Sequence, residues 1–495
     1  MSKDLEPATS TCTIPTDGSI EQITDRSDSR RLRWKVDRRL LPLLCITYAL
    51  QSIDKTTLSY AAVFGLEDDL GLKGSEYSWL GALFYLGYLV WEFPTNVMLQ
   101  KLRIDLFMAG TVIIWGIILI THGTSTSFSS QAAARTFLGA FEASINPGTM
   151  LLFSMYYSRA EQPLRMGLWI GSGGLGYVVA GIASFGLGHI SSSLQSWRVL
   201  YFFWGAVTAA WGVVLVGFLP GSPLEKKSKW GFLSEDEREM VLAKVRDNGT
   251  GVEDKTFKWG QFFEALGDVK TWLLVLFAVA SNAPNGGLTS FQGLIIKGMG
   301  FSTLQTTLIQ MPSGGVQMVV CPLACYIATH FPNTRIATMI LCILPFLAGT
   351  IGLQLLPQSN PYGRLVCLWI SFAYTASWTL CMSVATANTA GHTKKITTNA
   401  LVIIGYCLGN FVGPFFFKSA QAPGYALGIG MMFFCAAVQV LSLLTLWGLL
   451  VWRNRRRETE RRERGVGEED RRVLAFERGM RDETDLQNLC FQYVY

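Results

Sequence analysis

The sequence predicts an all-α integral membrane protein with twelve transmembrane helices arranged in two six-helix bundles. Half of its 495 residues are apolar and only 16% are charged, whereas a soluble protein ordinarily carries about a quarter charged residues. The charges gather in residues 1–39, in 220–270 and beyond Arg453. Between these stretches lie windows of almost uncharged sequence, and about 20 such residues are enough for a helix to cross a bilayer.

Six apolar windows precede a polar segment and six follow it, which is the organisation of an internally duplicated transporter. We therefore predict a disordered tail at 1–39, an N-terminal bundle at 40–219, a central loop at 220–267, a C-terminal bundle at 268–452 and a charged tail at 453–495. The predicted spans are 40–63, 77–99, 105–123, 130–157, 166–188 and 197–219, and then 269–296, 303–330, 335–356, 364–391, 396–418 and 424–452.

The basic residues predict the topology, because lysine and arginine collect in cytoplasmic loops. With both termini cytoplasmic, the basic connections face inward and the first outward connection is acidic, with Glu67, Asp68, Asp69 and Glu76. The net charge of +6 then reflects topology and does not point to nucleic acid. We expect a multi-pass monomer in the lipid bilayer of the plasma membrane.

The sequence offers no catalytic or metal-binding pattern. Ten cysteines are scattered singly and the four histidines lie far apart, and neither spacing suits a disulfide framework or a metal site. No nucleophile–base set or phosphate loop is present. We therefore expect a protein that is not an enzyme and that needs no cofactor or metal.

Ionisable side chains deep in the predicted spans are few, and all of them lie in the first half: Asp54, Lys55, Glu92, Arg135 and Glu142. Each costs about 2.5–3.5 kcal/mol at the centre of a bilayer, and such residues are functional by default. The second half instead carries uncharged polar groups at depth, namely Asn282, Asn285, Gln292, Gln310, Gln317, Asn388 and Asn410. One half is therefore suited to handle charge and the other to offer hydrogen bonds.

The four central charges bracket the membrane midplane. Counting about 1.5 Å per helical residue, Asp54 and Lys55 lie about 20 Å into the first span, in an apolar core about 30 Å thick. Arg135 falls in the outer third of the fourth span, and Glu142 lies just past its centre. These two residues are about two turns apart, so they share one helix face and are separated by about 10 Å along the axis.

The chemistry of each side chain suggests its role. A carboxylate removed from water holds its proton more tightly and a nearby cation loosens that hold, so Asp54 and Glu142 are the candidates for proton coupling. Arg135 keeps its charge and can grip a carboxylate at two points. We expect it to be the fixed counter-charge of Glu142 and a contact for the substrate. Lys55 is a point charge that suits an anionic group or a carboxylate. Static ion pairs between helices are the alternative.

Other polar and aromatic residues complete the candidate site. We assign Glu92, near the inner end of the second span, to gating or structure. The candidates for lining a substrate cavity are Tyr48, Asn282, Asn285 and Asn410, although each of them could serve packing or helix joining instead. The fifth span is rich in glycine, and glycine lets helix backbones approach closely in lipid. We expect a tight helix contact there that could also rock during transport.

The fourth span carries R-x-x-x-G-x-x-E-A from Arg135 to Ala143, followed by Pro147 and Gly148. This motif resembles that of the anion:cation symporter family of the major facilitator superfamily, in particular its fungal allantoate-permease-like clade. Further matching stretches are S-I-D-K-T-T-L-S-Y-A (52–61), G-Y-L-V-W-E-F-P-T-N (87–96), L-P-G-S-P through K-W-G-F-L-S-E-D-E (219–237), A-G-H-T-K-K (390–395) and I-G-Y-C-L-G-N-F-V-G-P (404–414). The resemblance covers roughly residues 35–450.

The resemblance implies a major facilitator fold and proton-coupled transport of a small organic anion. It implies proton coupling at Asp54 and Glu142, and contacts to anionic substrate at Lys55 and Arg135. Lysine stands at position 55 where some members have arginine, which keeps the charge but loses two-point geometry. Members of the family take ureides, vitamin carboxylates, small peptides and thiamine, so the resemblance does not name the substrate.

Two function classes remain: proton-coupled uptake, and proton-driven export of a drug or secondary metabolite. Antiporters of this superfamily usually show a Gly-Pro motif in the fifth span and a G-x-L-x-D-R-x-G-R-R loop after the second. Here the fifth span has no such motif, and the loop reads L-Q-K-L-R-I-D-L-F-M (99–108). Both departures favour uptake.

Overall fold

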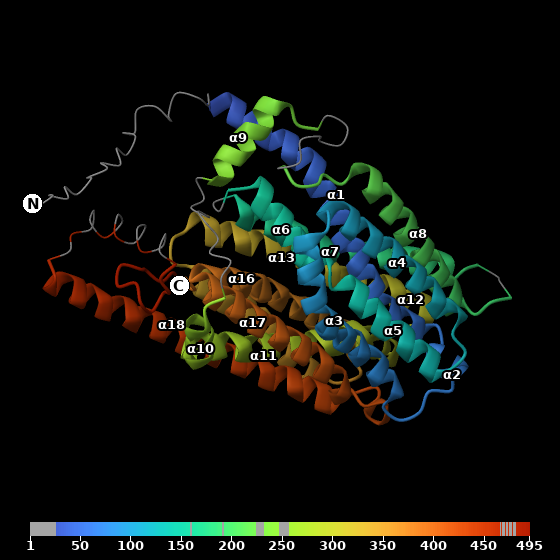
Figure 1. The fold of residues 1–495 in the computed structure, drawn as a ribbon. Coiled ribbons are helices and arrows are strands. Elements are labelled where there is room, and N and C mark those ends of the chain that lie inside the picture. Colours follow the sequence, from blue (N-terminus) through green and yellow to red (C-terminus); the bar gives the residue numbers. More distant parts are fainter. Residues whose placement is uncertain are drawn as a thin grey trace, which may run out of the picture.

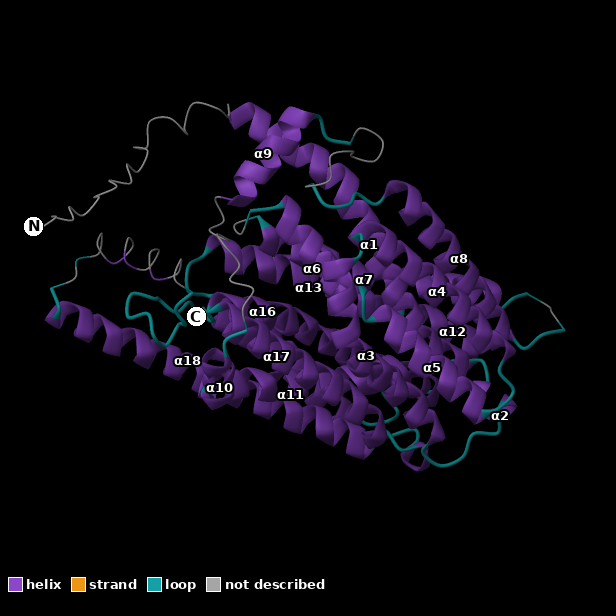
Figure 2. Ribbon diagram, in the orientation of Figure 1, coloured by secondary structure: helices purple, strands orange, loops and turns teal. Residues whose placement is uncertain are grey.

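The computed structural model describes residues 26–158, 161–190, 193–223, 232–246, 257–465, 467, 471, 474, 478 and 482–495. The regular structure of these residues is helical throughout (Figure 2). The first half holds α1 (Arg26–Val63), α2 (Leu66–Asp69), α3 (Glu76–Lys101), α4 (Ile104–Thr124), α5 (Phe128–Glu142), α6 (Ile145–Tyr156), α7 (Gln162–Leu187) and α8 (Ser196–Phe218).

The second half begins after two short helices, α9 (Glu235–Arg246) and α10 (Trp259–Gly267). It holds α11 (Val269–Gly298), α12 (Thr303–Ile309), α13 (Met311–His330), α14 (Arg335–Leu355), α15 (Pro361–Ile370), η2 (Ser371–Ala373), α16 (Tyr374–Ala387), α17 (His392–Val412), η3 (Gly413–Phe416), η4 (Ser419–Gln421) and α18 (Ala426–Glu463). Figure 1 shows the first-half helices grouped on one side and most second-half helices on the other. Each of the twelve predicted spans corresponds to one helix or to consecutive helices, so the prediction of twelve spans is confirmed.

The fourth span is interrupted just after Glu142, between α5 and α6. Pro147 lies in the first turn of α6, where its missing N–H needs no partner, but a proline there cannot continue a helix that arrives from residue 143. The break makes Glu142 the last residue of α5. The Glu142 carboxylate therefore lies at the end of a helix rather than in the middle of one.

Within the described residues, eight helices are long and apolar enough to cross a membrane by length and composition alone. The predicted spans outside that set are α1, α3, the α5–α6 pair and α11. The broken span consists of two short helices of 15 and 12 residues. These four spans also carry Asp54, Glu92, Arg135 with Glu142, and the asparagines of α11. The spans that depart from plain apolar sequence are thus the ones that hold most of the candidate site.

Both ends of the chain differ from the prediction. Residues 26–39 are not a disordered tail but the first turns of α1, and residues 1–25 lie outside the described part. Leu32, Val36 and Leu40 are buried at four-residue spacing, which stabilises one helix face. The Lys35 ammonium also lies 2.6 Å from a carboxylate oxygen of Glu237 in α9, which crosses α1 in Figure 1.

The far C-terminal segment is also folded rather than simply solvated. Arg457 and Arg461 of α18 are buried, although the alternation of Arg and Glu predicted a solvated helix. Residues 482–495 return to the end of the molecule where α1 begins and α18 ends, here called the termini end (Figure 1). An Arg/Glu pattern cannot distinguish solvent from a chain segment as the partner of these arginines.

Helix α7 packs on α13 and joins the two halves. Glycines line this contact: Gly167 faces Cys325, Gly171 faces Pro322, and the Cα of Gly174 lies directly against the carbonyl of Gly314. A methyl group at position 174 has no room between the two backbones. The close helix contact expected from the sequence is confirmed, and it lies between the halves.

We predict that Gly174→Ala lowers the melting temperature of the purified protein, because overpacking of a tight contact costs about 1–3 kcal/mol. The matched control is Gly186→Ala in the same helix, where an added methyl group meets nothing within 4 Å. That control is expected to be as stable as the parent or slightly more so, because alanine favours helix by about 1 kcal/mol. Equal melting temperatures for the two variants in detergent would contradict a tight contact between α7 and α13 at Gly174.

Candidate functional site

The first-half charges come together from α1 and α5. Asp54 and Glu142 are fully buried, and Arg135 is 2% exposed. The Lys55 ammonium lies 3.8 Å from a carboxylate oxygen of Glu142. An ion pair therefore links the first span to the end of α5 at the break in the fourth span.

The partner of Glu142 differs from the sequence prediction, which assigned Arg135 as its counter-charge. Arg135 instead donates a hydrogen bond at 3.0 Å to the hydroxyl of Tyr201 in α8. Two turns of α5 separate Arg135 from Glu142, and this distance is too long for a direct contact. Lys55 of α1 reaches the Glu142 carboxylate instead.

Asp54 and Lys55 point to different targets, as adjacent residues on a helix must. Asp54 accepts a hydrogen bond at 3.3 Å from the hydroxyl of Thr208 in α8. The Lys55 ammonium faces Glu142 and also lies 5.5 Å from the ring centre of Phe84. The two residues therefore divide the site, with Asp54 toward α8 and Lys55 toward α3 and α5.

Several polar atoms of this cluster have no hydrogen-bond partner among the described residues. They include both carboxylate oxygens of Glu142, Oδ1 of Asp54 and Nε of Arg135. Buried polar groups are ordinarily satisfied, and those that are not call for an explanation. Here the open positions are on ionisable groups, which can exchange protons or bind a charged ligand.

The second-half asparagines form one continuous chain of hydrogen bonds. Nδ2 of Asn410 donates to Asn282 at 3.3 Å, and Nδ2 of Asn285 donates to Asn410 at 2.7 Å. The hydroxyl of Tyr374 donates to Asn285 at 2.9 Å, and Nδ2 of Asn282 donates to the carbonyl of Ala278. The three residues thus come together and join α11, α16 and α17. This geometry favours the helix-joining role that the sequence left open.

Aromatic side chains lie between the charged cluster and the amides. The ring of Tyr406 in α17 lies 6.0 Å from Tyr85 and 6.1 Å from Tyr88 in α3, and it stacks on Trp378 at 5.2 Å. Tyr88 accepts a hydrogen bond at 3.0 Å from Asn146 of α6. Sequence reasoning missed Tyr406 and Trp378. The sequence did contain a signal for them: Tyr406 lies one helical turn before Asn410, and Trp378 lies one turn after Tyr374.

Tyr48 and Glu92 lie apart from the central charges. The ring of Tyr48 packs 4.6 Å from Trp169 of α7, which favours a packing role. Glu92 lies in the second half of α3, eight residues or about 12 Å along the helix from Phe84, and its Oε2 is buried without a partner among the described residues. Neither residue hydrogen-bonds to the charged cluster.

Three hydrogen bonds between the halves lie at the end opposite the termini end, here called the far end, and a fourth joins Gln317 of α13 to the carbonyl of Ile170 in α7 at 3.3 Å. Tyr77 donates to the carbonyl of Ser290 at 2.6 Å, and the N–H of Gly293 donates to Ser59 at 2.9 Å. The ammonium of Lys297 donates to the carbonyl of Val63 at 3.1 Å. These bonds tie the last turns of α1 and the first turn of α3 to α11.

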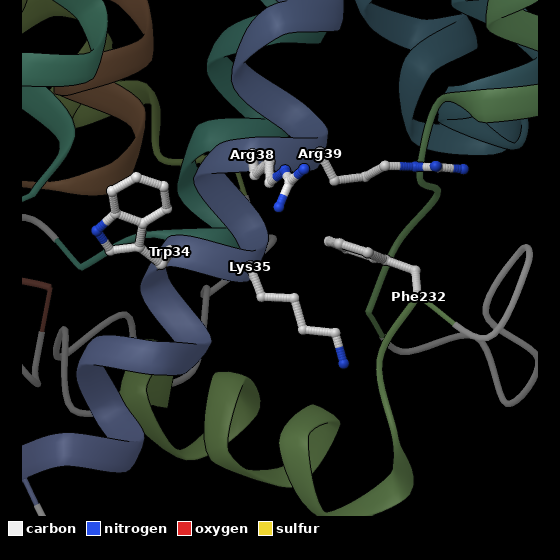
Figure 3. A pocket seen from close by; sticks show the side chains of 5 residues that line it. All are labelled: Trp34, Lys35, Arg38, Arg39 and Phe232. Atoms are coloured by element: carbon white, nitrogen blue, oxygen red, sulfur yellow. The ribbon is translucent and has the colours of Figure 1, made fainter.

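A pocket of about 460 Å³ lies elsewhere, against the start of α1 (Figure 3). Its lining residues are Trp34, Lys35, Arg38, Arg39 and Phe232. Arg39 precedes Asp54 by fifteen residues on one helix, which is about 22 Å. This pocket is therefore separate from the buried charges.

We predict that Lys55→Met destabilises the protein strongly, because removing one partner of a buried ion pair costs about 3–5 kcal/mol. The double variant Lys55→Met/Glu142→Gln should recover part of that loss in thermal unfolding. Lys101→Met, at an exposed position at the end of α3, is the charge-matched control and should have little effect. Additive losses in the double variant would show that the two side chains are not coupled.

Comparison with known proteins gives the family. A family model described as Major Facilitator Superfamily matches residues 44–414. An uncharacterized transporter of Schizosaccharomyces pombe is 37% identical over 431 residues, which cover 87% of this chain and 81% of the relative. The allantoate permease of Saccharomyces cerevisiae is 32% identical, covering 99% and 94%. The thiamine pathway transporter THI73 of the same yeast is 31% identical, covering 93% and 86%.

The fold is also that of solved transporters. A bacterial homologue of the human lysosomal transporter Spinster, in an inward-facing and unoccupied conformation, matches with a TM-score of 0.57 at 17% identity, covering 86% of this chain and 97% of that one. At this identity the likeness shows the fold alone, with its two bundles of six membrane helices. The resemblance found in the motifs is confirmed. The chain is a multi-pass membrane transporter rather than an enzyme, and it belongs to the major facilitator superfamily, within its allantoate-permease-like clade of fungal transporters.

Proposed function

We propose that the protein is a proton-coupled symporter that imports a small organic anion by alternating access. The observation that carries the proposal is the ion pair between the partly buried Lys55 and the fully buried Glu142, beside an Arg135 that has no carboxylate partner among the described residues. When Glu142 binds a proton, Lys55 loses its counter-charge. An anion near Lys55 and Arg135 then restores neutrality, so that proton and anion are bound together.

The charges of the site support coupled rather than separate binding. Asp54 and Glu142 balance Lys55 and Arg135, so the empty site is neutral when all four groups are ionised. A proton alone or an anion alone would leave net charge at membrane depth, which is costly. A proton and a singly charged anion that bind together add no net charge to the site. A ureide, a vitamin carboxylate or a small peptide fits this requirement, and the relative named allantoate permease supports an anion of this class.

The contacts between the halves support the direction of access. The far end is tied by hydrogen bonds between α1, α3 and α11, and the matching bacterial structure is described as inward-facing. We assign the termini end to the cytoplasm, in agreement with the distribution of lysine and arginine. On this assignment the protein opens toward the cytoplasm. A monomer in the plasma membrane is part of the same proposal.

The function is tested by a radiolabel uptake panel of ureides, vitamins and dipeptides in a yeast strain that lacks the corresponding transporters. Uptake of one anionic compound that collapses with a protonophore supports the proposal. Export of a preloaded compound against its gradient, with no uptake of any member of the panel, would favour the exporter instead.

We predict that Glu142→Gln reaches the membrane at the normal level but loses accumulation driven by a proton gradient. Counterflow of labelled against unlabelled substrate should persist, because it requires no net proton movement. Glu67→Gln in α2 is the matched control and should accumulate substrate normally. Unchanged pH-dependent accumulation in Glu142→Gln would remove Glu142 from the coupling mechanism.

We also predict that Arg135→Ala loses an anionic substrate preferentially over its neutral amide analogue, by tenfold or more if the lost contact is worth about 1.4 kcal/mol. The hydrogen bond from Arg135 to Tyr201 provides the control, because Tyr201→Phe removes that bond without removing the charge. Competition against uptake of the labelled anion measures both affinities. An equal loss of affinity for the two compounds would indicate that Arg135 only supports the structure.

A further inference from the structure

A second cluster of buried charges lies at the termini end of the second half. Lys270 at the start of α11 and Lys394 at the start of α17 are fully buried, and so is Asp485 of the C-terminal segment. Asp485 lies 2.9 Å from the ammonium groups of both lysines. This cluster is separate from the candidate transport site, which lies in the first half.

The charge of this cluster balances only when the C-terminal segment is included. Lys394 also pairs with Glu264 of α10 at 2.9 Å and with Asp268 at 3.1 Å. Asp268 in turn pairs with Arg453 of α18 at 2.8 Å and with Lys270 at 3.7 Å. Three cations therefore face three carboxylates, listed by element as Lys270, Lys394 and Arg453 against Glu264, Asp268 and Asp485. Without Asp485 the buried cluster carries one uncompensated positive charge.

The same segment also closes hydrogen bonds at the junction between α16 and α17. The side chain of Asn388 exchanges two hydrogen bonds with the backbone of Val494, each at 2.8 Å. Asp482 accepts from the N–H of His392 at 2.6 Å and from Gln261 of α10 at 2.9 Å. These contacts hold the first turn of α17 in place through backbone groups as well as charge.

An arginine and a tyrosine complete the attachment to α18. Arg457 donates to the carbonyl groups of Asp485 and Phe491, and its guanidinium lies 4.5 Å from the ring centre of Tyr493. The hydroxyl of Tyr493 donates to Asp485 at 2.9 Å. Asn454 donates to the carbonyl of Tyr493 and accepts from its N–H. The segment therefore contacts α10, α11, α16, α17 and α18 together.

We propose that the termini end of the second half is a peptide-binding site and that its occupant is residues 482–495 of the same chain, acting as an intramolecular latch. The bound segment neutralises Lys270 and Lys394 and fixes the α16–α17 junction. Helix α17 carries Tyr406 and Asn410 from this junction toward the far end, so its position depends on the latch. When the segment is released, the first turn of α17 loses these contacts, and the charge of Lys394 is no longer paired with Asp485. Helix α17 packs against α3 of the first half.

The latch is not a switch for ordinary changes of cytoplasmic pH. Burial opposes ionisation of Asp485, but the charges of Lys270 and Lys394 outweigh that effect and hold its pKa below the ordinary value. A lowered folded-state pKa stabilises the bound form above the ordinary aspartate pKa, about 3.9, and this stabilisation is lost only as pH falls through the lowered value. The segment therefore stays bound across neutral pH, and its release requires a competing ligand, cleavage or a change of sequence.

Hydrogen exchange of the purified full-length protein tests the latch without reference to any substrate. In the parent, amides of residues 482–495 and of the junction 388–394 should both be protected. Asp485→Asn should lose protection in both segments, whereas Glu483→Gln should not. Glu483 pairs only peripherally, 3.8 Å from Arg478, so this control removes the same charge from the same segment. Fast exchange of 482–495 in the parent, or full protection in Asp485→Asn, would overturn the proposal.

A second variant keeps the test valid if Asp485→Asn folds poorly. Lys270→Met/Asp485→Asn removes one charge of each sign and should recover melting temperature relative to Asp485→Asn alone. No recovery would contradict the charge balance described above. With a substrate from the uptake panel, Asp485→Asn should also transport more slowly than Glu483→Gln at equal membrane level. Equal rates with a released segment would overturn the link between latch and transport, while leaving the proposed symport untouched.

Discussion

The ion pair between Lys55 and the fully buried Glu142 is the interaction on which the charged half of the molecule depends. A charge at membrane depth needs a partner, and each of these residues supplies the other's. The pair forms because the fourth span breaks after Glu142 and because Gly139 lets α5 lie directly against the backbone of α3 near Phe84. The ion pair therefore depends on both the close packing of α5 on α3 and the helix break after Glu142.

The two halves stabilise their buried polar side chains in different ways. The amides of Asn282, Asn285 and Asn410 satisfy one another through directed hydrogen bonds and so favour one fixed arrangement. Glu142 and Asp54 keep unbonded oxygens, and their charge is balanced mainly by proximity. A group that is balanced but not fully hydrogen-bonded can change its protonation or its partner without dismantling a network. This difference agrees with the proposal that side chains of the first half change protonation during transport, while the amides of the second half hold its helices together.

The sequence was sufficient for the twelve spans, because apolar windows and their polar breaks depend only on local composition. It also singled out Asp54, Lys55, Arg135 and Glu142, which the structure brings together from α1 and α5. It could not identify the partner of Glu142, because helical spacing gives the face and depth of a residue but not the neighbouring helix. Nor could it identify the burial of Asp485, because a charge that pairs across 215 residues with Lys270 looks in sequence like any solvated charge.

Electroneutrality distinguishes what the two buried clusters can do. Around Lys394, each charge has a close opposite charge, and beside it the carboxylate of Asp482 accepts a hydrogen bond from the N–H of His392. A cluster of that kind is stable and specific, and another ion gains nothing by entering it. Around Lys55 the net charge is also zero, but the contact to Glu142 is long, at 3.8 Å, and among the described residues Arg135 donates to the neutral hydroxyl of Tyr201 and pairs with no carboxylate. In the proposed mechanism, joint entry of a proton and an anion keeps the charge balance of this cluster, which either one alone would break.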